Sequence, residues 1–200
     1  WRGRRLRRWR SIRVMVTTTE TTDIVTKPKL DEVVQPSFKR WLKHLLHMPA
    51  SKRFFNQQDQ HAIAQAVSAA EHGHIGEIQV VIEGHMPARE AYYLDTRGRA
   101  KQLFAELGVW DTELNSGILL YLNLCERKVE IVIDRGIQLA TTQQVWDEVC
   151  QSIIAKMAQQ QYRQALVDAV TEVGTILDHF YANKIEDKAD ELSNSPIMLN

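Results

Sequence analysis

The stretch that decides the fold covers residues 109–136, VWDTELNSGILLYLNLCERKVEIVIDRG. It holds two apolar runs, residues 117–124 and residues 128–134, which are separated by three residues. Two such runs around a short connection predict a hairpin of adjacent antiparallel strands. The first run is apolar at nearly every position, which predicts a strand covered on both faces, whereas the second run alternates. We therefore expect a central hairpin whose later strand has one face only partly covered.

Apolar periodicity on both sides of the hairpin predicts the remaining elements. Residues 76–83 (GEIQVVIE) alternate and predict one more strand. Helical spacing of apolar residues predicts helices over residues 37–47, 57–71, 89–107, 142–158 and 162–181. Because a helix joins the strand at 76–83 to the strand at 117–124, these strands should be parallel if adjacent, with a right-handed crossover. The expected fold class is α/β, with the hairpin adding an antiparallel strand.

The charges of the chain are unevenly distributed. The 200 residues include 25 basic and 25 acidic side chains, yet residues 1–13 hold seven arginines and no acid. The remainder therefore has 18 basic and 25 acidic residues, a net charge of −7. Because an acidic folded part has no evident affinity for nucleic acid phosphates, we expect no nucleic acid partner.

Composition and periodicity together predict four parts of the chain. Residues 1–35 read as a basic and flexible N-terminal extension, and residues 36–56 as an amphipathic helix with a linker. Residues 57–181 form the predicted α/β domain. Residues 182–200, charged and then polar, are expected to be a disordered tail.

The arginine-rich start, WRGRRLRRWRSIR, has two interpretations. It suits an arm that binds nucleic acid or membrane, and it equally suits a translated remnant upstream of Met15 in which residues 1–14 are not native. The sequence has no secretory apolar region and no run of about 18 apolar residues, so we expect a cytoplasmic protein. Cys125 and Cys150 have no CxxC spacing and are expected to be reduced thiols.

The predicted helix at residues 37–47 is strongly amphipathic. Its apolar stripe consists of Phe38, Trp41, Leu42, Leu45 and Leu46, and basic side chains cover the other side. One interpretation is that the stripe packs on the domain's own core. The other is a peripheral contact with an acidic membrane surface or a protein partner.

Four segments carry a resemblance to a known family. They are GEIQVVIE, RAKQLFAELGVWD (residues 99–111), NSGILLYL (115–122) and KVEIVIDRGI (128–137). In this order and at these separations they resemble the TPM domain family, over about residues 57–181. More narrowly, VWDTE, NSG and DRG look like its small bacterial members that lack a membrane anchor.

The resemblance implies a three-layer α/β/α sandwich with a small mixed sheet flanked by helices. It also implies an association with acid phosphatase activity and with binding of calcium or magnesium, although many members have no established reaction. The chain departs from the family in two ways. Ser116 stands where relatives often have a second asparagine before the glycine, and no signal or anchor is found.

The predicted topology gathers acidic residues at the sheet edge where the strand at 76–83 begins. They are Glu77, Asp111, Glu113 and Asp134, joined by the amide of Asn115. Calcium and magnesium prefer such oxygen ligands, and a cation or Arg135 would offset the repulsion between the carboxylates. The alternative is that these side chains are solvated loop residues or helix caps.

The opposite edge gathers Glu83, His85, Asn123, Glu126 and Arg127. These residues suit binding of a phosphorylated ligand or acid–base roles, or they simply decorate a charged turn. His72 and His74 are close together in the sequence and, with His85, suggest zinc only weakly. The spacing to a third ligand does not match that of a known zinc site. No nucleophile elbow or glycine-rich phosphate cradle occurs in the sequence.

Two functions follow as expectations. The first is a divalent-cation-binding accessory or partner-binding module without an established reaction, whose protein partner the sequence does not identify. The alternative is a metal-dependent acid phosphatase that acts on phosphomonoesters.

Overall fold

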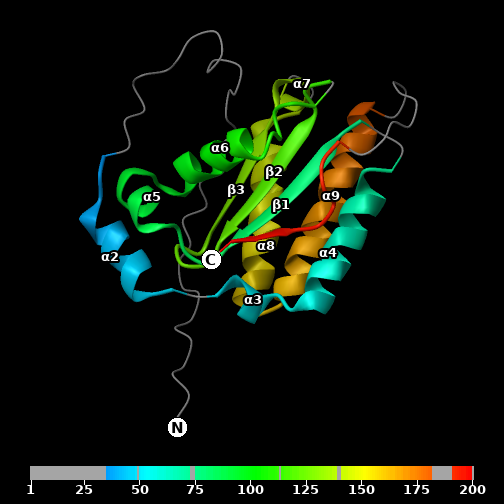
Figure 1. The fold of residues 1–200 in the computed structure, drawn as a ribbon. Coiled ribbons are helices and arrows are strands. Elements are labelled where there is room, and N and C mark those ends of the chain that lie inside the picture. The colour runs from blue at the N-terminus through cyan, green and yellow to red at the C-terminus, as the bar shows by residue number, and fades with distance from the viewer. Residues whose placement is uncertain are drawn as a thin grey trace.

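A four-stranded mixed sheet forms the centre of the molecule in the computed structural model (Figure 1). The structure describes residues 35–48, 50–72, 75–112, 114–138, 141–181 and 191–199. The strands are β1 (Glu77–Glu83), β2 (Gly117–Asn123), β3 (Lys128–Ile133) and β4 (Ile197–Leu199), in the order β3-β2-β1-β4.

The pairing of the strands confirms the predicted topology. β1 runs parallel to β2, from the pair Glu77–Gly117 to the pair Glu83–Asn123. β2 and β3 form the antiparallel hairpin, with Ile118 opposite Ile133. Helices cover both sides of the sheet, so the three-layer α/β/α class is also confirmed.

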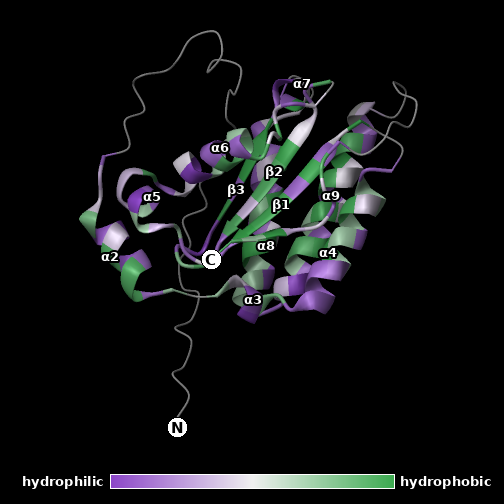
Figure 2. Ribbon diagram, in the orientation of Figure 1, coloured by the Kyte–Doolittle hydropathy of each residue, from purple (hydrophilic) through white to green (hydrophobic). Residues whose placement is uncertain are grey.

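One face of the sheet is apolar throughout. It is covered by α4 (Gln57–Ala70), α8 (Gln143–Ala158) and α9 (Tyr162–Tyr181), as Figure 1 shows. The strand residues on this face are all buried, and they are Ile78, Val80, Ile82, Ile118, Leu120, Leu122, Val129, Ile131 and Ile133. Figure 2 shows much of these strands in green, interrupted by white and purple at other positions. The buried side chains of this face make the layer the main hydrophobic core.

The other face is covered by α6 (Thr96–Glu106), next to the shorter α5 (Ala88–Tyr93). The prediction of one helix over residues 89–107 is therefore wrong. Leu94 and Asp95 are extended, and the Asp95 carboxylate accepts a hydrogen bond from Gly98 N at 2.8 Å. Asp95 thus acts as an N-cap that starts a new helix.

The C-terminal segment corrects a second prediction. Residues 191–199, placed in a disordered tail from the sequence, are ordered, and Ile197–Leu199 adds β4 parallel to β1. Residues 182–190 of the same predicted tail lie outside the described residues. A strand of three residues is too short to give an alternating signal, which explains why the sequence did not predict it.

The later strand of the hairpin is covered more fully than predicted. Glu130, Val132 and Asp134 point to the α6 side and are only 3%, 2% and 5% exposed. α6 packs across β3 and closes this face, although β3 is an edge strand. Polar side chains are therefore buried on the α6 side of the sheet.

Three short helices complete the described part of the chain. α2 (Phe38–Leu46) packs against α5 beyond the edge of the sheet, α3 (Ser51–Phe54) leads into α4, and α7 (Arg135–Gln138) follows β3. Among the helices of the described residues, none has the length and hydropathy that crossing a bilayer requires.

Candidate functional site

The predicted metal edge is only partly assembled. Glu77 and Asp134 lie at the same end of the sheet, because Glu77 opens β1 and Asp134 N donates to Gly117 O at 2.9 Å. Asp111 and Asn115 are exposed, and Glu113 lies outside the described residues. Among the described residues, Glu77, Asp111 and Asp134 do not bring one carboxylate oxygen each to within 4.8 Å of one another. The metal assignment at this edge stays a prediction.

Two carboxylates at this edge differ in their surroundings. The Glu77 oxygens accept hydrogen bonds from Glu191 N at 3.3 Å and Leu192 N at 3.2 Å, so they hold the C-terminal segment. Asp134 has one oxygen bonded to Arg135 N, while its Oδ2 is buried without a hydrogen-bond partner. Burial raises the pKa of Asp134, and the hydrogen bond from Arg135 lowers it in part. Asp134 is therefore the carboxylate at this edge that fits a cation ligand.

The opposite edge holds a buried hydrogen-bond network around Glu83. Arg99 donates to Glu83 Oε1 from Nε at 3.1 Å and from Nη2 at 2.9 Å. Tyr121 OH donates to Glu83 Oε2 at 2.5 Å, and Asn123 Nδ2 donates to the Tyr121 hydroxyl at 2.8 Å. Burial and the Glu83 charge hold the pKa of Tyr121 well above its usual range. The network fixes α6 on the sheet.

The Glu83 network leaves little room for a substrate. Glu83 and Asn123, both predicted site residues, are 1% and 0% exposed, and Tyr121 is 0% exposed. Their polar groups bond mainly to one another. Sequence reasoning missed Arg99 and Tyr121, although the alternate polar positions 77, 79 and 83 of β1 signalled a polar face.

The hairpin turn contributes a second polar cluster, which reaches α2. Glu126 lies 2.9 Å from Lys43 Nζ and 3.2 Å from His44 Nε2. Burial alone would raise the pKa of Glu126, but the hydrogen bonds from His44 and Lys43 and the Lys43 charge lower it to about 2. Glu126 therefore stays ionised at neutral pH and ties the turn to α2.

His44, Cys125 and Glu126 form the one group of three potential metal ligands within 4.8 Å in the described part of the chain. Their chemistry does not suit a metal. His44 Nδ1 accepts a hydrogen bond from Met86 N at 3.0 Å, so Nε2 carries the proton and has no lone pair for an ion. Burial raises the pKa of Cys125 to about 11, and Lys43 already neutralises Glu126. This cluster is better described as a set of contacts that anchor α2.

The other predicted site residues of this edge are His85 and Arg127. His85 is half-buried with an unpartnered Nδ1, and Arg127 occupies a left-handed turn position with φ 57°. His72 is exposed and His74 lies outside the described residues, so the structure does not test the weak zinc interpretation.

α2 presents its polar side to the protein. Arg40 Nε donates to Ala91 O at 2.8 Å and Arg40 Nη2 to Tyr92 O at 3.2 Å, which satisfies carbonyls at the end of α5. Ser37 N donates to Tyr92 O at 2.9 Å. His44, in the last turn of the helix, is 1% exposed. The helix is thus held through hydrogen bonds and ion pairs.

Most of the apolar stripe of α2 faces solvent as a result, while its fifth member, Trp41, is half-buried. Four side chains, which we call the α2 ridge, are exposed: Phe38 (65%), Leu42 (37%), Leu45 (45%) and Leu46 (74%). Met48, just after the helix, is also exposed. The interpretation in which this stripe packs on the domain's own core is therefore wrong, because Arg40 and His44 occupy the inward side.

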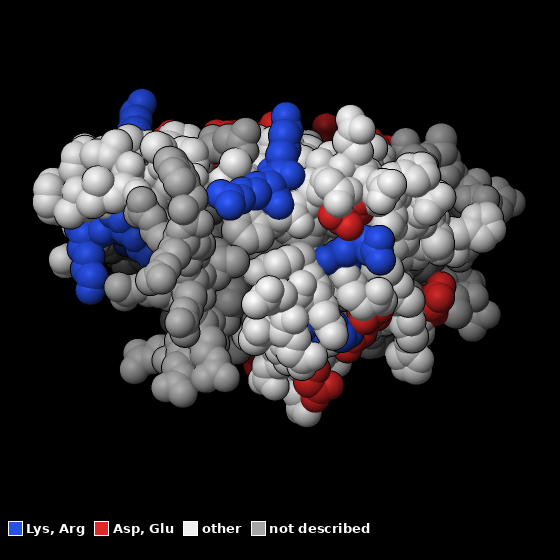
Figure 3. Space-filling model, turned by 90° about the horizontal axis from the view of Figure 1, so that it is seen from below, with Lys and Arg blue, Asp and Glu red and all other residues white. Residues whose placement is uncertain are grey.

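Basic side chains accompany α2 on the lower surface. Seen from below in Figure 3, Lys and Arg gather toward the α2 side and the centre of this face, while Asp and Glu lie mainly toward the opposite side. Lys39 on α2 and Lys52 and Arg53 on α3 are exposed. The apolar ridge therefore belongs to a basic region of an otherwise acidic chain.

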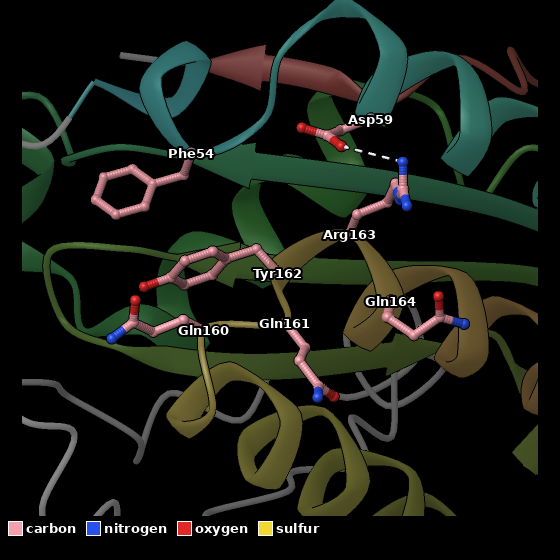
Figure 4. A pocket seen from close by; sticks show the side chains of 7 residues that line it. All are labelled: Phe54, Asp59, Gln160, Gln161, Tyr162, Arg163 and Gln164. Atoms are coloured by element: carbon pink, nitrogen blue, oxygen red, sulfur yellow. Dashed lines mark ion pairs between the residues drawn. The ribbon is translucent and has the colours of Figure 1, made fainter.

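A polar hollow of about 580 Å³ lies where α3 and α4 meet the turn between α8 and α9. Figure 4 shows Phe54 and Tyr162 at one side and Asp59 facing Arg163 at the other, with glutamine side chains that do not converge. Asp59 and Arg163 form an ion pair at 3.9 Å, and Asp59 also caps α4. The hollow is open and its charged groups already have partners.

The fold and these two edges define a three-layer α/β protein with a polar sheet face and an outward amphipathic helix. A family model described as the TPM domain matches residues 50–176, so the chain belongs to the TPM domain family. The NMR structure of the BA42 protein from the psychrophilic bacterium Bizionia argentinensis is similar, with a TM-score of 0.64 and 28% identity. That match covers 72% of this chain and 94% of BA42. A comparison with curated proteins gave no match.

Proposed function

We propose that this TPM domain is an accessory module that docks onto another surface through the α2 ridge. The observation that carries this proposal is the orientation of α2. An amphipathic helix is bound to the domain by its polar side, which leaves the four side chains of the α2 ridge exposed. Contiguous exposed apolar side chains rimmed by polar groups are typical of interaction sites.

The polar sheet edge supports an accessory role over catalysis. The Glu83 network is buried and its members bond mainly to one another, so it offers no group poised toward a substrate. A nucleophile or general base has to reach the reacting atoms of its substrate. These side chains stabilise the packing of α6 instead.

The apolar-surface probe ANS tests the docking face directly. We expect native full-length protein to enhance ANS fluorescence, and the double variant Leu42→Gln/Leu45→Gln to lose most of that enhancement. Gln is a good helix former, so α2 should persist, which circular dichroism can check. Leu114→Gln is the matched control, because Leu114 is 42% exposed at the other end of the domain. Equal fluorescence of the native protein and the double variant would overturn the proposal.

Divalent cation binding is a second proposed property, and Asp134 favours it. Its Oδ2 is buried and without a hydrogen-bond partner, and Asn115 and Asp111 are predicted to lie at the same edge. Calorimetric titration with calcium and with magnesium should give heat that Asp134→Asn removes. Unchanged binding in Asp134→Asn would assign the cation to other residues.

The phosphatase alternative needs a separate assay. Hydrolysis of p-nitrophenyl phosphate with magnesium or calcium should be at background level if the protein is an accessory module. Turnover that both Asp111→Ala and Asp134→Ala abolish would replace the accessory role with a metal-dependent phosphatase. Asp147→Ala on α8 is a control, because Asp147 is not one of the predicted metal ligands. Its carboxylate accepts a hydrogen bond from Gln143 of the same helix.

We also propose a cytoplasmic location. Cys125 and Cys150 are both free and buried, as expected for a protein kept in a reducing compartment. Fractionation of cells that express the full chain tests this location.

A further inference from the structure

We propose that the surface bound by the α2 ridge is an anionic lipid surface. This inference rests on the proposed docking function and names its partner. It is carried by three features of the described residues, which are the shape of the ridge, the charges beside it and the way α2 is held.

The α2 ridge has the form of an interfacial anchor. Its side chains occupy neighbouring turns of one helix, and Phe38 stacks on the half-buried Trp41 with ring centroids 5.1 Å apart. A helix of nine residues is about 14 Å long, too short to cross an apolar layer of about 30 Å. It is long enough to lie in the headgroup region with its apolar side chains inserted.

The charges around the ridge complement an anionic surface. Residues 33–58 contain no Asp or Glu and have five Lys or Arg, whereas the chain after residue 13 is acidic overall. Lys39 precedes the ridge residue Leu42 by three residues, so it lies along the side of the ridge. Lys43 is paired with Glu126 and is not counted among the cations available to a bilayer. Lys52 and Arg53 extend the basic region onto α3. Each cation near an anionic bilayer adds to binding, and its aliphatic part can lie along the apolar layer.

The polar side of α2 keeps the ridge turned outward. Glu126 pairs with both Lys43 and His44, and Arg40 bonds to the carbonyls that end α5. Rolling the ridge inward would break these contacts and would leave the buried His44 and the half-buried Glu126 without partners, which is costly. The docking surface is therefore preformed, and binding requires little reorganisation.

The same features argue against two other occupants. A two-fold interface uses the same surface patch on both copies of a chain. A second copy would therefore bring its own Lys39, Lys52 and Arg53 toward the same basic patch, and the like charges would repel. A protein groove is less suited than lipid, because lysine is depleted in protein interfaces and is favoured at anionic membranes. Both remain distinguishable outcomes of the experiment.

Vesicle flotation of the full chain tests the proposal. We expect binding to phosphatidylcholine vesicles that contain about 30% phosphatidylglycerol, and at least tenfold weaker binding to phosphatidylcholine alone. Leu42→Gln/Leu45→Gln should lose about tenfold or more of the partition coefficient, even at about 0.5 M salt, where charge attraction is screened. Lys39→Gln/Lys52→Gln/Arg53→Gln should lose a similar factor at low salt and less at high salt.

The outcomes separate this inference from the docking function. The Leu42→Gln/Leu45→Gln variant keeps all seven arginines of residues 1–13, so undiminished binding would assign lipid affinity to that segment and overturn the proposal. Equal binding to both vesicle types would overturn its anionic part. Absence of vesicle binding together with ridge-dependent ANS fluorescence would overturn the lipid partner and leave the docking function standing. Ridge-dependent dimerisation in sedimentation equilibrium without vesicle binding would make a second copy the occupant.

Discussion

α2 and α9 are both amphipathic helices, but they are oriented in opposite ways. α9 turns Ala169, Val173 and Leu177 toward the sheet, where all three are buried. α2 turns Arg40 and His44 toward the protein and leaves the α2 ridge in solvent. An apolar stripe therefore shows that a helix has two unlike sides, and the partners available to the polar side decide which of them faces inward.

The largest effect should come from the Glu83 network. Polar side chains hold α6 on the sheet there, just as polar side chains hold α2 on the domain. Arg99→Met should destabilise the protein by about 3–5 kcal/mol, because it leaves the Glu83 charge buried without its cation. Urea unfolding measures the change. In the double variant Glu83→Gln/Arg99→Met much of this loss should be recovered. A loss under about 1 kcal/mol for Arg99→Met alone would mean that polar packing matters far less than its geometry indicates.

A matched pair of leucine truncations tests the comparison itself. Leu177→Ala in α9 should cost about 2–5 kcal/mol, since the side chain is fully buried in the core beside Gly76, the residue before β1. Leu45→Ala in α2 should change the free energy of unfolding by less than about 0.5 kcal/mol. Similar losses for the two variants would show that the α2 ridge packs on the domain after all.

The pH dependence of stability distinguishes the two faces of the sheet. Burial raises the pKa of Glu130 to about 7, despite the hydrogen bond from Thr96 at 2.5 Å. Between the usual glutamate pKa and this raised value, the folded protein holds a proton that the unfolded chain has released. The free energy of unfolding should therefore fall as the pH rises from about 4.5 to about 7, by about 3 kcal/mol in total.

The variant Glu130→Gln should remove this slope. Its difference from the native protein is expected to be constant below about pH 4.5 and to move in favour of the variant as the pH rises to about 8. Leu120→Ala on the apolar face should give a loss that does not vary with pH. Parallel stability curves for the native protein and Glu130→Gln would refute the assignment.

A smaller loss than those of Arg99→Met and Leu177→Ala is expected on the polar side of α2. His44→Ala should cost about 1–3 kcal/mol, because it leaves Met86 N–H buried without an acceptor and removes one partner of Glu126. Hydrogen exchange should show that α2 becomes less protected, with little change in α9. His47→Ala, at an exposed position of the same segment, is the control. Equal exchange in both variants would contradict the anchoring role of His44.

The sequence predicted the central elements well because their patterns are long. The hairpin around residues 125–127 and the parallel pairing of β1 with β2 followed from apolar runs and from the connecting helix. The break at Leu94 and Asp95 was missed, since an N-cap inside a helical pattern gives only a local signal. β4 was missed because three residues carry no period.

The candidate sites were harder to predict from the sequence. The predicted edge around Glu83 and Asn123 does hold a polar cluster, but burial and the partners Arg99 and Tyr121 depend on packing that no spacing rule gives. The orientation of α2 depends on Glu126 and on the backbone of Met86, which lie more than 40 residues further along the chain. Long-range partners of this kind decide where an amphipathic stripe faces.

The depth of a nitroxide label attached at Leu45→Cys tests the central claim most directly. Cys125 and Cys150 are buried, which protects them from the labelling reagent, and a label at the exposed Gln164→Cys provides the control. With vesicles that contain phosphatidylglycerol, the label at position 45 should collide more with oxygen and less with a water-soluble nickel chelate, while the label at position 164 should not change. A label at position 45 that is shielded from the chelate before any vesicles are added would contradict the outward orientation of the α2 ridge.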